Sequence, residues 1–66
     1  MKNFYTLLYL QGLHQEVISR SFEIEHIAKL IKNLPNWKKK YIAIFTSNGR
    51  DVTKWAIMKS KVVKEG

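Results

Sequence analysis

The chain has 66 residues, no cysteine and a formal net charge of +7. A domain this short buries only about 60% of the surface that its unfolded chain exposes, so it holds one small core and gains stability from self-association. The absence of cysteine excludes disulfides and agrees with a cytoplasmic location. The longest apolar run, Phe4 to Leu10, is too short to span a membrane.

Two strands joined by a turn are predicted first. Residues 3–10 are aromatic and aliphatic, Gly12 lies in the turn, and residues 16–22 form the return strand. A two-residue turn centred on Gly12 and Leu13 fixes three pairs: Leu10 with Gln15, Leu8 with Val17 and Tyr5 with Arg20. The side expected to face the core carries Phe4, Leu8, Leu10 and Val17. A longer loop would shift the pairing by one residue and exchange the two sides.

A helix is predicted next. Apolar residues recur at helical spacing after Ser21, the expected N-cap, and the buried stripe consists of Ile24, Ile27, Ala28, Ile31 and Leu34. Pro35 disfavours helical geometry at the residue before it, so the helix is expected to end near Asn33. Residues 36–39 are expected to form a loop.

A second hairpin is predicted around Asn48 and Gly49, because an Asn-Gly pair between strand-like runs is favoured in a type I′ turn. In this register Phe45 pairs with Val52 and Ile42 pairs with Trp55. Residues on one side look like core, namely Ile42, Ile44, Thr53, Trp55 and Ile57.

The predicted fold is therefore α+β, a single domain over residues 1–66 with the order β-β-α-β-β. One helix packs on one face of a four-stranded antiparallel sheet and leaves the other face uncovered. That uncovered face is expected to combine aromatic residues with cations, namely Tyr5, Tyr9, Arg20, Tyr41, Phe45, Lys54 and Met58. The sequence leaves the order of the strands open. Either the two hairpins are neighbours in the sheet, or the first strand lies at the centre of the sheet.

Charge is distributed unevenly along the chain. Residues 1–28 have a net charge of −1, whereas residues 29–66 have a net charge of +8. The predicted basic patch consists of Lys29, Lys32, Lys38, Lys39 and Lys40, beside Trp37, which is expected to cap the core. Such a patch attracts phosphates, although lysines also keep small apolar proteins soluble. Arg50 in the second turn is either a phosphate contact or part of ordinary turn chemistry.

The sequence favours a binding protein over an enzyme. His14 and His26 lack ligand spacing, and no nucleophile motif, metal set, cofactor motif or glycine-rich phosphate loop is present. Aromatic residues interleaved with cations are typical of surfaces that bind single-stranded DNA or RNA, where rings stack on bases and cations contact phosphates. Nucleic acid or another phosphate-rich ligand is therefore the predicted partner.

Two other interpretations use the same residues. The aromatic face is also typical of a homodimer interface, where Tyr, Phe, Met and Arg are enriched. In size and single-domain design the chain is similar to small inhibitor proteins of phages and mobile elements, which dock on a host protein. In a variant of that interpretation the protein sequesters a nucleotide, with phosphates on Arg50, Lys54 or Arg20 and the base on a Tyr or Trp.

Overall fold

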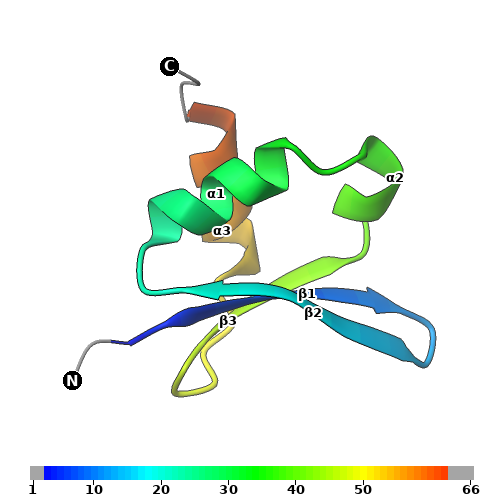
Figure 1. Ribbon diagram of the computed structural model, residues 1–66, viewed down its shortest axis with the longest axis horizontal. Coiled ribbons are helices and arrows are strands. Elements are labelled where there is room, and N and C mark those ends of the chain that lie inside the picture. Colours follow the sequence, from blue (N-terminus) through cyan, green and yellow to red (C-terminus); the bar gives the residue numbers. More distant parts are fainter. Residues whose placement is uncertain (1–2, 63–66) are drawn as a thin grey trace.

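The computed structural model describes residues 3–62. Its elements are, in chain order, β1 (Tyr5–Gln11), β2 (His14–Ser21), α1 (Ile24–Lys32), α2 (Asn36–Lys39), β3 (Ile42–Thr46) and α3 (Thr53–Val62). The three strands form one antiparallel sheet in the order β2-β1-β3, and the helices lie on one side of it (Figure 1).

The predicted α+β class is confirmed, but the predicted four strands are wrong. The chain follows the order β-β-α-β-α, with the additional short helix α2, and the segment expected to be the fourth strand is helix α3. The first strand lies at the centre of the sheet, which is one of the two arrangements left open by the sequence.

The register of the first hairpin agrees with the prediction near its turn. Gly12 has a φ of +60°, which L side chains rarely adopt, and Leu10 pairs with Gln15 and Leu8 with Val17. Farther from the turn the register shifts, because a bulge next to Leu8 places one extra residue in β2. Tyr5 therefore pairs with Ser21 and not with the predicted Arg20.

For β1, the prediction of which side meets the helices is wrong. Leu7 is fully buried and Tyr9 is only 6% exposed, so the odd-numbered residues of β1 face the helices. Leu8 and Leu10, which were expected in the core, lie on the other side. Residues 3–10 are apolar on both sides of the strand, and such a pattern leaves the buried side undetermined.

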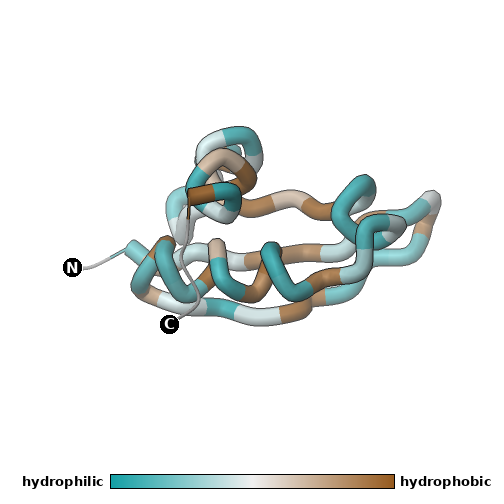
Figure 2. Tube along the Cα trace, turned by 90° about the horizontal axis from the view of Figure 1, so that it is seen from above, coloured by the Kyte–Doolittle hydropathy of each residue, from teal (hydrophilic) through white to brown (hydrophobic). Residues whose placement is uncertain are grey.

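The uncovered side of the sheet is called the open face below. Pairing across the three strands assigns to it Phe4, Thr6, Leu8, Leu10, Gln15, Val17, Arg20, Ala43 and Phe45. Figure 2 shows brown, hydrophobic stretches on the strands and a teal, hydrophilic colour at α2. Most of the residues that the pairing assigns to the open face are apolar, whereas Asn36, Lys38 and Lys39 of α2 are polar.

Helix α1 follows the predicted pattern. Ile24, Ile27, Ala28 and Ile31 are buried and pack against the sheet, and the C-cap is Asn33. The N-cap is Glu23 and not the expected Ser21, whose hydroxyl instead accepts a hydrogen bond from the Glu23 N–H at 3.1 Å. Residues 36–39, expected as a loop, form the single-turn helix α2 after Pro35.

The second turn is present, but it does not lead into a strand. Gly49 alone has a positive φ, +87°, whereas a type I′ turn needs positive φ at Asn48 as well. Phe45 pairs with Asp51 in an isolated bridge and not with the predicted Val52. Residues 50–53 then follow the outer edge of β3, where the Val52 N–H donates to the Ile44 carbonyl at 2.9 Å.

Helix α3 begins after this short edge segment. The Asp51 carboxylate accepts hydrogen bonds from the backbone N–H and the hydroxyl of Thr53, as expected of a side chain that caps a helix start. Ala56 and Ser60, four residues apart on one helix face, are buried, and α3 packs against α1. Two small residues at this spacing allow the helices to approach closely.

Candidate functional site

Aromatic rings gather around Tyr9 at the end of the sheet nearest α2. Edge-to-face contacts join the Tyr9 ring to Trp37 at 6.1 Å and to Tyr41 at 6.3 Å between centroids, and His14 lies at 6.0 Å. The Tyr9 hydroxyl also donates a hydrogen bond to the Gln11 side chain. Tyr9 is thus a buried centre that holds the surrounding rings in place.

The rings around Tyr9 remain open to solvent. Trp37 is 58% exposed and Tyr41 is 42% exposed. Trp37 therefore contacts the covered side of the sheet through Tyr9, but more than half of its surface is available to a ligand. We call this group, together with the lysines of α2 and its C-cap, the α2 cluster: Tyr9, His14, Trp37, Lys38, Lys39, Lys40 and Tyr41.

The three consecutive lysines of the α2 cluster differ in their surroundings. Lys38 lies over the Tyr9 ring, with its Nζ at 5.0 Å from the ring centroid and at 3.9 Å from a carboxylate oxygen of Glu16. Lys39 is partly buried and Lys40, the C-cap of α2, is exposed. The ion pair with Glu16 reduces the local charge, so Lys39 and Lys40 contribute most to a positive surface here.

The other predicted lysines lie on α1. Lys29 and Lys32 are both in the last turn of α1, at the negative end of the helix dipole, and both are exposed. The chain leaves that turn through Asn33, Leu34 and Pro35 and enters α2 directly. The two groups of lysines are therefore separated by one short connection along the chain.

A second candidate site is a hollow between the β3–α3 loop, β1 and the start of α3. It is open to solvent, has a volume of about 1040 Å³ and is lined by Asn3, Tyr5, Ile42, Ala43, Thr46, Asn48, Arg50, Asp51, Val52, Thr53, Lys54 and Trp55. Tyr5 and Trp55 contact each other there, with ring centroids 6.0 Å apart. We call it the Arg50 hollow.

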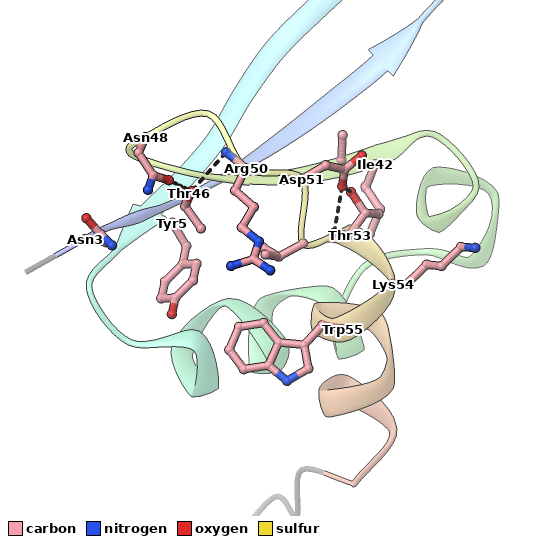
Figure 3. Close-up of a pocket in the computed structure, with 12 residues that line it drawn as sticks. Asn3, Tyr5, Ile42, Thr46, Asn48, Arg50, Asp51, Thr53, Lys54 and Trp55 are labelled. Atoms are coloured by element: carbon pink, nitrogen blue, oxygen red, sulfur yellow. Dashed lines mark hydrogen bonds between the residues drawn. The ribbon is translucent and has the colours of Figure 1, made fainter.

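Figure 3 shows how the charged side chains of the Arg50 hollow are directed. The Arg50 guanidinium points towards the Tyr5 and Trp55 rings, whereas the Lys54 side chain extends away from them. Asp51 is held at the start of α3 by its hydrogen bonds with Thr53, and these bonds lower the pKa of its carboxyl. The hollow thus combines an inward-pointing cation with two aromatic rings.

The predicted sheet-face site is not assembled as expected. Tyr5 and Tyr9 lie on the helix-covered side, Tyr41 precedes β3 and contacts Tyr9, and Lys54 and Met58 are on α3. Of the seven residues expected together, Arg20 and Phe45 lie on the open face. The difference follows from the replacement of the fourth strand by a helix and from the opposite orientation of β1.

The structure adds two aromatic residues that the sequence did not place in a site. Trp55 was expected in the core but is 43% exposed at the rim of the Arg50 hollow, and Trp37 projects from the α2 cluster. For Trp37 a signal exists in the sequence, since it directly precedes Lys38, Lys39 and Lys40. For Trp55 the signal is the helix start at Asp51 and Thr53, because a helix directs the Trp55 side chain differently from the predicted strand.

Within residues 3–62, no three His, Cys, Asp or Glu side chains gather in a way that would hold a metal ion. No helix in this part of the chain has the length and apolar character to cross a membrane. Comparison of the chain with protein-family models, curated proteins and solved structures found no match.

Proposed function

We propose that this protein binds single-stranded nucleic acid, non-enzymatically, through the α2 cluster. The observation that carries the proposal is the pair of exposed rings, Trp37 and Tyr41, which flank Lys39 and Lys40 in the sequence. Exposed aromatic rings stack on unpaired bases, and neighbouring lysines neutralise the phosphates between them.

The rigidity of the α2 cluster supports this function. Trp37 and Tyr41 both rest on the buried Tyr9 ring, so less side-chain freedom is lost when a base stacks on them. Lys38 is already engaged by Tyr9 and Glu16 and orders the short helix. The lysines bind phosphates of any sequence, so the expected binding is strong in low salt and weakly sequence-specific.

A salt titration with a labelled mixed-sequence DNA or RNA oligonucleotide tests the proposal. The logarithm of the association constant should fall linearly with the logarithm of the salt concentration, by about 0.7 per phosphate contacted. The double variant Lys39→Gln, Lys40→Gln should reduce that slope by about 1.4 if each lysine contacts one phosphate. Trp37→Ala should weaken binding by about 1–3 kcal/mol at every salt concentration, because one stacking surface is lost.

A matched control removes the same charge elsewhere. Lys54→Gln with Lys61→Gln takes two positive charges from α3, whose exposed residues lie outside the α2 cluster. This variant should lose less affinity and keep most of the salt slope. Equal losses in both double variants would mean that net charge alone attracts the oligonucleotide, and binding without salt dependence would exclude the proposed contacts.

The open face favours a second candidate, self-association. Arg20 is the only charged residue assigned to that face within the described part of the chain, and the others are apolar apart from Thr6 and Gln15. Two copies can meet there while the lysines of α1 and α2, which lie on the helix side of the sheet, stay apart (Figure 1). A second copy is therefore the occupant that we propose, as expected of a small domain that gains buried area by pairing.

A further inference from the structure

The Arg50 guanidinium has an unusual setting for an arginine of this small protein. Within residues 3–62 no carboxylate lies at ion-pair distance from it, and it points into the Arg50 hollow towards two rings. The backbone N–H of Arg50 donates to the Thr46 hydroxyl at 3.1 Å, which fixes where the side chain leaves the loop. The guanidinium is a planar fork of donors, which is suited to a phosphate or carboxylate.

Aromatic surface lies within reach of the same guanidinium. Tyr5 and Trp55 contact each other at a tilt of 55°, so a flat ligand cannot slide between them and would lie against the exposed part of the indole. Lys59 approaches the Trp55 ring at 5.6 Å and lies 4.0 Å from a carboxylate oxygen of Glu25, but it does not line the hollow. The hollow therefore offers an anion site and a stacking surface side by side.

We propose that the Arg50 hollow binds a nucleoside phosphate, with the phosphate on Arg50 and the base against Trp55. The side-chain amides of Asn3 and Asn48 and the Thr46 hydroxyl line the same space and provide neutral polar groups. Its volume of about 1040 Å³ is at the upper end of small-ligand sites and leaves room for base, sugar and phosphate.

Asp51 is the acidic group that an incoming phosphate would meet. Its carboxylate accepts two hydrogen bonds from Thr53 at the start of α3, so it is directed towards the helix. Arg50 and Lys54 outnumber it among the charged lining residues. The hollow therefore keeps a net positive charge.

This site is separate from the α2 cluster and does not depend on nucleic-acid binding there. Trp37 supports the proposed stacking in the α2 cluster, whereas Trp55 lines the hollow. A free nucleotide that binds in the Trp37→Phe variant reports on the hollow alone. Failure of the oligonucleotide titration thus leaves this proposal standing, and the reverse also holds.

The test uses the full chain with Trp37→Phe, so that Trp55 is the one tryptophan left. Adenosine 5′-monophosphate is titrated while indole fluorescence is recorded, with adenosine and inorganic phosphate as separate arms. The expected result is saturable quenching by the nucleotide, with at least about tenfold weaker binding of either fragment, because each fragment makes only one of the two contacts.

Arginine variants supply the matched controls. Arg50→Gln should weaken nucleotide binding at least about tenfold and Arg50→Lys by an intermediate factor, because lysine keeps the charge but loses the planar fork. Lys61→Gln removes the same charge from an exposed position on α3 that does not line the hollow, so its effect should stay within about threefold. Circular dichroism of each variant establishes that the fold is intact.

Three results would overturn the proposal. Absence of saturable quenching, confirmed by the absence of a thermal shift, would mean that the hollow binds no nucleotide. If inorganic phosphate binds as tightly as the nucleotide, the hollow is an anion site that does not recognise the base. Equal losses for Arg50→Gln and Lys61→Gln would show that general positive charge, and not the guanidinium in the hollow, attracts the ligand.

Discussion

The hydroxyl of Thr53 accepts a hydrogen bond from the backbone N–H of Ile44 at 3.0 Å. The same hydroxyl donates to the Asp51 carboxylate at 2.6 Å, so one side chain joins the middle of β3 to the start of α3. Ile44 is fully buried, and its N–H would otherwise lack a partner on the outer edge of the sheet. Thr53 therefore determines how α3 leaves the sheet.

Thr53→Val tests this joint, because valine has nearly the same shape but no hydroxyl. We expect a loss of about 1–3 kcal/mol in the free energy of unfolding, since the Ile44 N–H loses its acceptor. Thr53→Ser keeps the hydroxyl and should lose less. Urea unfolding followed by circular dichroism measures both, and equal stability of the valine variant and the native chain would contradict the proposed role.

The Asp51 carboxyl should make stability depend on pH. Its hydrogen bonds with Thr53 hold the pKa below the ordinary value of 3.8, so the ionised form stabilises the folded state above that pH. The stabilisation should be lost as the pH falls through the lowered pKa. Thermal unfolding between about pH 5 and about pH 2 should therefore show a smaller decline for Asp51→Asn than for the native chain. Parallel declines would mean that other carboxyls control acid unfolding.

Substitution of Ala56 tests the contact between α1 and α3. Ala56 is fully buried, so Ala56→Leu forces extra volume into a packed contact and should cost about 1–3 kcal/mol of stability. Met58→Leu on the exposed face of α3 is the control and should change stability by less than about 0.5 kcal/mol. Thermal unfolding compares the two, and a neutral Ala56→Leu would be inconsistent with the packing of α3 on α1.

A charge on the open face should prevent self-association. Val17 is 47% exposed, so Val17→Lys costs little in folding but places an ammonium on the apolar surface. We expect the native chain to sediment as a dimer and the variant as a monomer. Lys61→Gln, a substitution on α3, should sediment as a dimer like the native chain. If the native chain is monomeric and binds another protein through this face, the proposed dimer is wrong and the open face belongs to that other partner.

Local patterns in the sequence predicted α1 and the first turn well. The spacing of Ile24, Ile27, Ala28 and Ile31 defines a helix stripe, and Gly12 fixes a two-residue turn by its positive φ. The bulge in β2 has no comparable signal, because nothing in residues 16–22 marks an extra residue. Register was therefore predictable close to the turn and not beyond the bulge.

Helix α3 was missed because the Asn48-Gly49 pair has a strong preference for hairpins. That preference concerns only the turn, whereas the structure after it depends on Asp51 and Thr53, which begin a helix, and on Ala56 and Ser60 at helical spacing. The Arg50 hollow was not predicted, for a related reason. Arg50, Tyr5 and Trp55 come together only when α3 turns back over the sheet.

The segment 50–53 that lines the outside of β3 has a consequence for assembly. It occupies hydrogen-bonding groups on that border, so within residues 3–62 the free border of the sheet belongs to β2. Strand addition between copies can therefore proceed from one border only. Two molecules that join β2 to β2 form a closed pair, whereas a fibre that grows by strand addition alone needs two unblocked borders in each copy.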